Sequence, residues 1–558
     1  MIFPVVQKIE SSSGCSVGEN DAICVRGAME SMFVSRLREA GFRCSADGKI
    51  KIETRIKNNR SHTYIEESRR VSDEKYFISS TFAGGSLWIK VSAGGRRGLY
   101  HACSNLIKQL SSGKIALGEI SDYPLFAVRG YIEGFYGKPW SFEERADMLR
   151  LMAFHGMNTY YYAPKNDPYH REQWDAMYPE KELAALKRLM DIAQRCCVSF
   201  VYCIAPGLGI KYSSDENYER LLKKLLSLYD ARARDFGLLL DDIPPELFHE
   251  EDRECFDGEA VNAHIYLVNR LYTDLKKLDP TVKLTVCPLE YHGTGDGYYI
   301  SKFGQNIPAG VRIFWTGRNI CSQELTEREA MLFSESVMHR PLYWDNFPVN
   351  DAEMCNELHL GYLTGRDRGL YRYSAGLIAN CMEYCECSKV PLLTVADYLW
   401  NPEKYDELTS WRYALKTVLG DDAEAFEYFA DNMLTSCLKI ENSPKLNGVV
   451  SKAGMLMRAG DARSACGIIR AYTAPARRCA EIIGRQDKKL YSECEKWLGK
   501  FRLAIDILDA CADTIETEDL EKALILKNFL SEYQSMPETV ADFSLREAAE
   551  TVLKKFNL

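Results

Sequence analysis

The chain has 558 residues, of which 46% are hydrophobic, 27% charged and 11% aromatic, and its formal net charge at pH 7 is −9. This composition excludes a disordered, fibrous or collagen-like protein, and the acidic balance argues against nucleic acid or an anionic membrane as a partner. At roughly 150 residues per domain the length predicts two to four domains, and we expect three, over residues 1–122, 123–402 and 403–558.

The first residues and the cysteines bear on the compartment. The opening segment, MIFPVVQKIESSSG, lacks the cationic head and long apolar stretch of a signal peptide, and no run reaches the roughly 18 to 20 apolar residues of a membrane helix. The 19 cysteines include the adjacent pair Cys196 and Cys197, which a disulfide framework rarely uses. We therefore expect a cytoplasmic protein with reduced thiols; secretion is the alternative if a signal peptide preceded this sequence.

Three cysteines, Cys381, Cys385 and Cys387, lie close enough together to suggest a metal site. Neither a CxxC spacing nor a pair of histidines accompanies them, and those are usual ligand patterns of zinc. Structural cysteines are therefore favoured, and no metal site is predicted.

The first predicted domain mixes strand-like and helix-like runs. Apolar alternation predicts strands at IKIETRI from Ile50, KYFISST from Lys75 and SLWIKVS from Ser86. Helical spacing predicts helices from Ala28 and Arg96. This mixture is typical of a small α+β domain, and the SDYP stretch marks its end.

From residue 123 the pattern changes to short apolar runs that alternate with amphipathic helices, which is typical of parallel strands joined by helical crossovers. We predict eight such strands, and they begin at Phe126, Asn158, Ser199, Phe236, Lys283, Val311, Pro341 and Gly376. Eight strand and helix units over this length match a (β/α)₈ barrel; a doubly wound open sheet is the alternative. The spacing of Ser141 and Glu144 predicts a capping box that opens the first helix, and Gly156 can end it.

Beyond residue 402 the strand-like runs stop. Segments such as DDAEAFEYFADNML and ECEKWLGKFRLAIDILDACA recur with helical period. Residues 403–558 are therefore predicted to form an all-helical domain that packs on the barrel or forms a homodimer.

Polar and aromatic side chains stand where the predicted barrel strands end, and the active site of such a barrel lies at the carboxyl ends of its strands. We predict that one mouth is lined by Gly134, Tyr136, Lys165, Asp241, Asp242, Tyr291, Thr316, Trp344, Asn346, Asp351 and Asn380. Carboxylates, aromatics and amides recur at the strand ends without histidine or cysteine, which favours sugar chemistry over metal or thiol chemistry. Cleavage of a glycosidic bond needs one acid to protonate the leaving oxygen and one carboxylate to manage the developing positive charge.

The adjacent pair Asp241 and Asp242 can supply both groups. Taken alone, two aspartates after a strand more often serve in a turn or a helix cap, just as an aromatic at a strand end more often belongs to the core. Their place at the mouth favours catalysis. Neighbouring side chains of an extended strand point to opposite sides, so one carboxylate can reach the 2-substituent of a sugar and the other the glycosidic oxygen. This arrangement favours substrate assistance, in which the acetamide oxygen of the sugar attacks the anomeric carbon.

Several motifs, in order along the chain, resemble glycoside hydrolase family 84, the O-GlcNAcase family and its bacterial relatives. The similar stretches are EGFYGKPW from Glu133, NTYYYAPKNDPYHR from Asn158, LLLDDI from Leu238, CPLEY from Cys287, FWTG from Phe314, WDNFPVND from Trp344, Asn380, and VADYLWNPEKYDE from Val395. The resemblance covers the whole barrel, and the bacterial members also carry an α+β domain before it and a helical domain after it.

The resemblance implies a role for each matched residue. Asp241 would orient the acetamide and stabilise an oxazolinium intermediate, and Asp242 would act as general acid and then as general base. Tyr291 would hydrogen-bond the acetamide oxygen, while Trp344 would wall its pocket and Tyr136 would shape it. The residues that match the family's sugar-hydroxyl contacts are Gly134, Lys165, Asn346, Asp351 and Asn380.

Two positions depart from the family pattern. Asn166 stands where an aspartate often follows the lysine, and Cys381 replaces a common proline. The first is expected to alter the charge around Lys165, and the second to shift the backbone that aims Asn380.

The resemblance thus implies a retaining exo-β-N-acetylglucosaminidase that needs no cofactor and removes terminal β-linked N-acetylglucosamine from glycoconjugates, including O-GlcNAc on serine and threonine of glycoproteins. A hyaluronidase-type or cell-wall-fragment glucosaminidase is the alternative among enzymes, although the acidic balance argues against a long polyanion. An inactive carbohydrate-binding scaffold is the alternative of another class, and the presence of both aspartates and Tyr291 argues against it.

Overall fold

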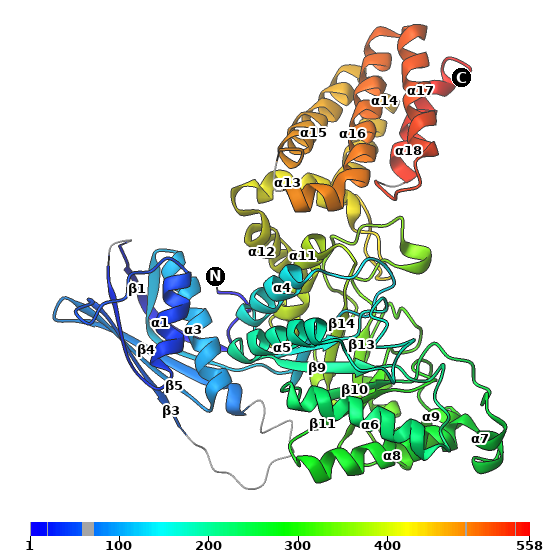
Figure 1. Ribbon diagram of the computed structural model, residues 1–558. Helices are drawn as coiled ribbons and strands as arrows, with labels where there is room; N and C mark the ends of the chain where they lie inside the picture. Colours follow the sequence, from blue (N-terminus) through cyan, green and yellow to red (C-terminus); the bar gives the residue numbers. More distant parts are fainter. Residues whose placement is uncertain (1, 19–20, 58–71, 486–487, 542) are drawn as a thin grey trace.

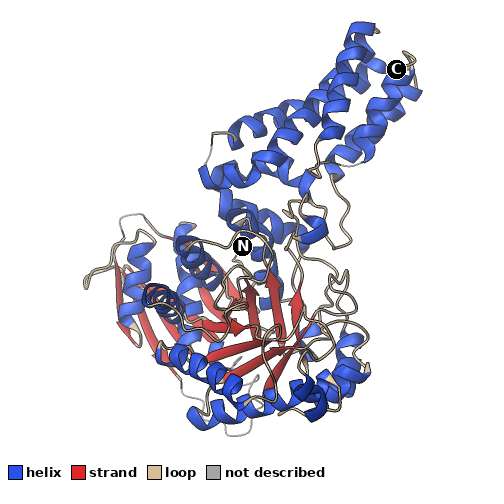
Figure 2. Ribbon diagram, turned by 45° about the vertical axis from the view of Figure 1, so that its right-hand side comes forward, coloured by secondary structure: helices blue, strands red, loops and turns tan. Residues whose placement is uncertain are grey.

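The computed structural model describes residues 2–18, 21–57, 72–485, 488–541 and 543–558 (Figure 1). Along the chain it has a mixed sheet with helices, a closed barrel of eight strands, and a helical region that projects from the barrel (Figure 2). The predicted fold class, a (β/α)₈-type barrel with an N-terminal α+β part and a C-terminal helical part, is confirmed. The residue limits expected for the three domains stay predictions.

The N-terminal sheet has six strands in the order β1-β6-β4-β5-β3-β2, and its helices pack on one face (Figure 1). Its elements are β1 (Lys8–Ser16), β2 (Ile23–Gly27), α1 (Glu30–Glu39), β3 (Ile50–Ile56), β4 (Tyr76–Ala83), β5 (Ser86–Ala93), α3 (Arg96–Ser111) and β6 (Lys114–Asp122). The three predicted strands and both predicted helices are confirmed. The alternation rule misses three more strands, and β1 shows why: KIESSSGCS is an edge strand with almost no apolar residues.

All eight predicted barrel strands are confirmed. They are parallel, and pairing of β14 with β7 closes the barrel, so the open-sheet alternative is wrong. The strands are β7 (Val128–Ile132), β8 (Thr159–Tyr162), β9 (Ser199–Ile204), β10 (Asp235–Leu239), β11 (Lys283–Cys287), β12 (Val311–Trp315), β13 (Pro341–Asp345) and β14 (Gly376–Asn380). Every residue of β7, β8, β13 and β14 is buried, which explains why these strands show little apolar alternation.

Helices follow the barrel strands with one exception. They are α4 (Phe142–Phe154), α5 (Glu180–Arg195), α6 (Asp215–Asp230), α7 (Glu250–Cys255), α8 (Ala260–Leu278), α9 (Tyr298–Gln305), α10 (Glu327–Val337) and α11 (Cys385–Trp400). Between β13 and β14, where every residue is described, the chain forms only the 3-10 turns η1 (Ala352–Met354) and η2 (Leu370–Arg372). The expected helix is therefore wrong for this unit, because FPVNDAEMCNELHLGYLTGRDRG is rich in residues that disfavour a helix interior.

The predicted start and end of α4 are confirmed. The Ser141 hydroxyl accepts a hydrogen bond from the backbone N–H of Glu144 at 3.2 Å, and the Glu144 carboxylate accepts one from the backbone N–H of Ser141 at 2.6 Å. Gly156 has φ +92°, and a Cβ there would lie 2.6 Å from the ring of Trp400. The turn from α4 into β8 therefore needs glycine for both its backbone and its space.

A buried ionic cluster joins the N-terminal sheet to the barrel. Glu74, just before β4, is fully buried, and its carboxylate accepts hydrogen bonds from Arg129 of β7 and, at 2.9 Å, from Asn158. His101 of α3 lies 3.3 Å from the same carboxylate. Trp400, at the end of α11, packs into the core of the N-terminal sheet. Because Arg129 is near the start of its strand, this contact covers the amino-terminal end of the barrel and leaves the other end open.

Beyond the barrel the described chain is helical, as predicted. The elements are α12 (Glu407–Leu419), η3 (Gly420–Asp422), α13 (Ala423–Ala430), η4 (Asp431–Met433), α14 (Pro444–Arg458), α15 (Ala462–Ile483), α16 (Lys488–Thr517), α17 (Leu520–Ser535) and α18 (Phe543–Lys554). Helix α16 packs against α11 of the barrel, where the sulfur atoms of Cys387 and Cys494 lie 3.4 Å apart. A homodimer through this region stays a prediction.

Candidate active site

The carboxyl ends of the barrel strands surround a cavity of about 560 Å³, a size that suits a small ligand. All the residues expected at the mouth line it: Gly134, Tyr136, Lys165, Asp241, Asp242, Tyr291, Thr316, Trp344, Asn346, Asp351 and Asn380. The lining residues that sequence reasoning missed are Cys287, Phe314, Ile320, Cys321, Val349, Ala352, Glu353 and Met354. The structure therefore brings together side chains from at least seven strand ends.

The two aspartates follow β10 and share one cation. Nζ of Lys165 lies 3.5 Å from Oδ2 of Asp241 and 3.6 Å from Oδ2 of Asp242. The extended geometry expected for the pair is wrong, because Asp242 has φ +53° and leaves the strand conformation. Such a left-handed residue costs roughly 1–3 kcal/mol, so the surrounding contacts must hold it in place. Both carboxylates therefore reach the same side of the cavity.

Hydroxyl groups and a lysine favour the ionised form of Asp242. The hydroxyl of Tyr136 donates to Oδ2 at 2.9 Å, and that of Tyr291 donates to Oδ1 at 3.2 Å. Burial alone would raise the pKa of this carboxyl, but the charge of Lys165 and the two hydroxyls outweigh burial and lower the pKa below its ordinary value. Burial likewise opposes the charge of Lys165, yet Asp241 raises the pKa of that ammonium above its usual range.

Tyr136 is fixed at both ends. Its backbone N–H donates to Oδ2 of Asp351 at 2.7 Å, and its hydroxyl accepts a hydrogen bond from Nη1 of Arg171 at 3.1 Å. Because the guanidinium can only donate, the phenolic proton is directed to Asp242. Sequence reasoning missed Arg171, although it ends the NTYYYAPKNDPYHR stretch, because it lies several residues beyond the strand end.

The ends of β13, β14 and β7 form one wall of the cavity. Oδ1 of Asn346 accepts hydrogen bonds from the Trp344 indole and from Nδ2 of Asn380, both at 3.0 Å. The backbone N–H of Gly134 donates to Oδ1 of Asn380 at 3.2 Å. A Cβ on Gly134 would lie 2.5 Å from the Trp344 ring, so glycine leaves room for the indole. This wall combines a fixed aromatic ring with amide groups, which suits an acetamide substituent.

Thr316 and Asp351 differ in how their polar groups are used. The backbone N–H of Thr316 donates to the carbonyl of Tyr291 at 2.8 Å, and its hydroxyl donates to the carbonyl of Asn319 at 2.7 Å. Thr316 therefore supports the loop that carries Tyr291.

Asp351 is a third carboxyl at the cavity. Burial raises the pKa of Asp351, and this effect outweighs the backbone N–H of Tyr136 and the charge of Lys165, which lower it. The Asp351 carboxyl comes from the irregular β13–β14 connection and faces the cavity.

The two departures from the family pattern have local structural uses. Asn166 donates from Nδ2 to the carbonyl of Gly137 and so joins the loops after β7 and β8. Cys381 is fully buried, and its backbone N–H donates to the carbonyl of Ile132 at 3.3 Å. Proline has no N–H and could not make this bond. Asn380, just before it, still reaches Gly134.

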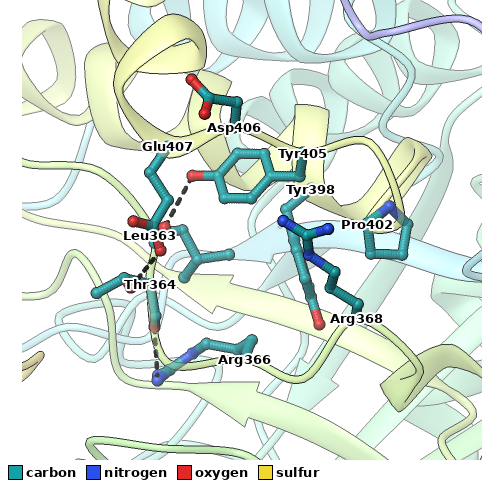
Figure 3. A pocket seen from close by; sticks show the side chains of 9 residues that line it. All are labelled: Leu363, Thr364, Arg366, Arg368, Tyr398, Pro402, Tyr405, Asp406 and Glu407. Atoms are coloured by element: carbon teal, nitrogen blue, oxygen red, sulfur yellow. Dashed lines mark hydrogen bonds between the residues drawn. The ribbon is translucent and has the colours of Figure 1, made fainter.

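A smaller cavity of about 220 Å³ lies beside the β13–β14 connection and the start of α12 (Figure 3). Its polar groups are paired within the protein. The hydroxyl of Tyr405 donates to the carbonyl of Leu363 at 2.8 Å, and the guanidinium of Arg366 donates to both oxygens of Asp345, at 2.8 and 2.6 Å. Arg366 thereby fixes the end of β13 from behind. We assign a structural role to this cavity and ligand binding to the cavity of about 560 Å³ at the strand ends.

Two further features were searched for in the described parts of the chain. No three His, Cys, Asp or Glu side chains gather there in a group that could hold a metal ion. No helix there combines the length and apolar character that crossing a bilayer requires.

Comparison with known proteins gives three kinds of match. The family described as beta-N-acetylglucosaminidase matches residues 129–431. Protein O-GlcNAcase of Rattus norvegicus is 32% identical over 275 residues, and the same values hold for that of Mus musculus. These matches cover 48% of this chain and 29% of each relative, so the chain spans less than a third of the length of these curated proteins.

Solved structures extend the match beyond the barrel. A mutant O-GlcNAc hydrolase of Thermobaculum terrenum is 34% identical, with a TM-score of 0.73, over 77% of this chain and 95% of that one. The structure of CpGH84B is 23% identical, with a TM-score of 0.84 over 99% of this chain and 100% of that one, and supports the three-part fold. With more than half of its residues matched to one family, the chain belongs to the β-N-acetylglucosaminidases of glycoside hydrolase family 84.

Proposed function

We propose that the chain is a retaining exo-β-N-acetylglucosaminidase that works by substrate-assisted catalysis. The observation that carries the proposal is the pair Asp241 and Asp242, held within 3.6 Å of one Lys165 nitrogen at the cavity that Trp344 walls. A carboxylate nucleophile and an acid must flank the glycosidic bond from two sides. The wall beside this pair, with the Trp344 ring and the amides of Asn346 and Asn380, can hold an acetamide. The acetamide oxygen can then replace the carboxylate nucleophile, while the two aspartates serve the acetamide N–H and the leaving oxygen.

In this mechanism the acetamide oxygen attacks the anomeric carbon. Asp241, the more buried carboxylate, accepts the acetamide N–H and stabilises the positive oxazolinium ring. The glycosidic C–O bond breaks, and Asp242 gives its proton to the leaving oxygen. Water then attacks the same carbon while Asp242 takes the proton back. Two inversions give net retention, and no protein atom becomes bonded to the sugar.

Substrate binding would prepare Asp242 for its first step. Without substrate, the hydroxyl of Tyr291 donates to Asp242 and helps to keep it ionised. An acetamide oxygen that accepts this proton instead removes one group that lowers the pKa of Asp242. Displacement of water from the cavity acts in the same direction, because burial favours the neutral acid. The acid form is thus favoured only when a suitable sugar is bound.

O-GlcNAc on proteins is the substrate that we propose, since the curated relatives carry the name O-GlcNAcase. The test is a side-by-side panel of an aryl β-N-acetylglucosaminide, an O-GlcNAc serine peptide, hyaluronan fragments and muropeptides. We expect turnover of the first two. Faster cleavage of hyaluronan or muropeptides would favour the alternative enzymes, and turnover of none of the four would favour a binding scaffold.

A thiazoline that mimics the bicyclic intermediate tests the mechanism itself. Intermediate mimics bind about 10² or more tighter than substrate when the site is built for them. We expect tight competitive inhibition of the native chain, weakened by Asp241→Asn because the ring nitrogen loses its partner. Inhibition no stronger than that by N-acetylglucosamine would instead favour an enzymic nucleophile.

All 19 cysteines are free thiols in the structure. Free thiols in such number are usual in reducing compartments, so a cytoplasmic location is part of the proposal. Fractionation of the cells that make the protein tests the proposed location.

The predicted homodimer is a separate part of the proposal, and sedimentation of the purified chain tests it.

A further inference from the structure

Helix α16 of the helical region reaches back to a loop of the active-site cavity. It packs between α15 and α17, and its N-terminal part also contacts α11 of the barrel (Figure 1). The indole N–H of Trp497 in α16 donates to the backbone carbonyl of Asn356 at 2.9 Å. Asn356 lies in the connection between β13 and β14, shortly after Asp351. A side chain of the helical region therefore holds the loop that brings Asp351 to the cavity.

This loop, residues 350–357, is closed at its base and lines the cavity at its tip. The side-chain amide of Asn350 donates to the carbonyl of Glu357 at 2.7 Å, which closes the base. The tip, residues 351–354, lines the cavity, and its side chains are half-buried or exposed. Ala352 has φ +50°, a conformation that residues other than glycine keep only where their surroundings hold them. The tip therefore depends on contacts made at the base.

Trp497 is itself fixed in place. Its side chain is 1% exposed, and its ring meets that of Tyr384, just before α11, edge to face with 5.4 Å between the ring centroids. One turn earlier in α16, Glu493 accepts hydrogen bonds from the backbone N–H groups of Glu386 and Cys387, at 3.1 and 2.9 Å. This carboxylate caps the start of α11, where backbone N–H groups have no partner within the helix. The indole donor is thus anchored to the barrel on two sides.

We propose that Trp497 is a positioning residue of the active site: its indole N–H holds the loop 350–357 so that the Asp351 carboxylate keeps its place in the cavity. Asp351 is expected to contact a sugar hydroxyl, so the effect on catalysis rests on the proposed function. The position of Asp351 has a second consequence that does not. Its Oδ2 accepts the backbone N–H of Tyr136 at 2.7 Å, and a displaced carboxylate would leave that amide open to exchange with solvent.

Trp497→Phe removes the indole N–H and keeps an aromatic ring beside Tyr384. The Asn356 carbonyl keeps a partner, because the backbone N–H of Thr539 also donates to it, at 2.7 Å. We expect the KM for the aryl β-N-acetylglucosaminide to rise roughly fivefold, the effect of one hydrogen bond of ordinary strength. The value of kcat should change by less than about twofold, because substrate and transition state make the hydroxyl contact alike. Trp497→Met, which also lacks a donor and adapts to the space, takes its place if the phenylalanine variant does not fold.

Trp411→Phe is the matched control. Trp411 of α12 is also buried, and its indole N–H donates to the carbonyl of Leu360 in the same β13–β14 connection, at 2.7 Å. Leu360 lies beyond the closed loop and away from the residues that line the cavity. We expect denaturant unfolding to show a similar loss of stability in the two variants, and Trp411→Phe to keep the KM of the native chain.

A double-mutant cycle with Asp351→Ala separates positioning from general loosening of the fold. If Trp497 acts through Asp351, the loss in kcat/KM caused by Trp497→Phe should shrink to less than about twofold once the carboxylate is absent. The same loss in both backgrounds would overturn the proposal. So would an equal rise in KM in Trp411→Phe.

Hydrogen exchange supplies the readout that does not depend on activity. Peptides that contain the Tyr136 amide are compared by mass spectrometry in the native full-length chain and in both tryptophan variants. We expect a loss of protection at this amide in Trp497→Phe, and native protection in Trp411→Phe. Unchanged protection in Trp497→Phe would contradict the positioning role. Failure of the proposed function is distinguishable, since the native chain would then leave the aryl β-N-acetylglucosaminide intact while exchange still reports the position of Asp351.

Discussion

The hydroxyl of Tyr136 lies 2.9 Å from Oδ2 of Asp242, although the two residues follow the first and the fourth strands of the barrel. Arg171 donates to the same hydroxyl at 3.1 Å. Since the guanidinium occupies the acceptor side of the hydroxyl, the phenolic proton points to the carboxylate. The direction of this hydrogen bond stabilises the ionised form of Asp242, and this has a measurable consequence for catalysis.

Tyr136→Phe removes that donor and keeps the ring. The hydroxyl is one of the groups that lower the pKa of Asp242, so the pKa should rise in the variant. A general acid works in its protonated form, and the basic limb of the kcat/KM profile should therefore move to higher pH. Tyr298→Phe is the control, because Tyr298 donates to Glu259 at 2.9 Å outside the cavity. A basic limb that stays in place or moves to lower pH would contradict the assignment.

Asp242→Ala should separate substrates by their leaving groups. An aryl glucosaminide with an acidic phenol needs little protonation, whereas a serine glycopeptide needs a full proton. We expect the variant to lose about 10²- to 10⁴-fold on the glycopeptide, the usual contribution of a general acid, and much less on the aryl substrate. Asp241→Ala should slow both substrates alike, since it acts on the acetamide. Equal losses on both substrates in Asp242→Ala would show that this carboxylate is not the acid.

Gly134→Ala tests the acetamide wall. The added Cβ would lie 2.5 Å from the Trp344 ring, so the indole must leave its place in the cavity wall. We expect a KM for the aryl glucosaminide raised roughly tenfold, because about 1.4 kcal/mol of binding is a tenfold effect. The same clash should lower the free energy of unfolding by about 1–3 kcal/mol. Gly467→Ala is the control: it lies in α15, with nothing within 4 Å of the new carbon. An unchanged KM in Gly134→Ala would argue that the indole does not contact the substrate.

The barrel was predictable because its strands are buried on both faces and are followed by polar residues. Each strand therefore appears in the sequence as an apolar run, and residues that line the cavity come shortly after it. Tyr291 and Trp344 were found in this way, as were the aspartates. The polar edge strand β1 was not, since nearly all of its described side chains are exposed and polar, so its sequence shows no apolar alternation. Nor was the missing helix after β13, because the absence of a helix is only a weak compositional signal.

Side-chain contacts from distant segments lie beyond what spacing can show. Arg171 reaches the site from a loop whose course depends on the packing of whole helices. The backbone conformation of Asp242 could not be predicted either, because the sequence LLLDDI does not indicate that this aspartate adopts φ +53°. Local sequence predicts which residues come to the mouth, whereas their partners depend on the tertiary fold.

The contact between the N-terminal sheet and the barrel depends on an ionised Glu74. Burial alone would raise the pKa of this carboxyl, but Arg129, His101 and Arg97 outweigh it and hold the pKa well below its ordinary value. Its pKa in the unfolded chain is about 4.3. Since the folded pKa is the lower one, the charge contributes stability above pH about 4.3, and that contribution is lost as the pH falls through the folded pKa.

Glu74→Gln should therefore destabilise the chain in a pH-dependent way. At neutral pH it leaves the Arg129 guanidinium buried without its counter-ion, which costs roughly 3–5 kcal/mol. The difference in the free energy of unfolding between the variant and the native chain should shrink below pH about 4.3, because protonation of Glu74 then begins to remove the stability that its charge contributes. Denaturant unfolding of the variant and the native chain, at neutral and at acidic pH, measures this difference at each pH. Glu10→Gln is the control, because its pair with Lys8 is exposed on both sides, and solvent screens such a pair so that its loss changes stability little. A cost for Glu74→Gln that stays constant with pH would mean that the cluster acts through packing and not through charge.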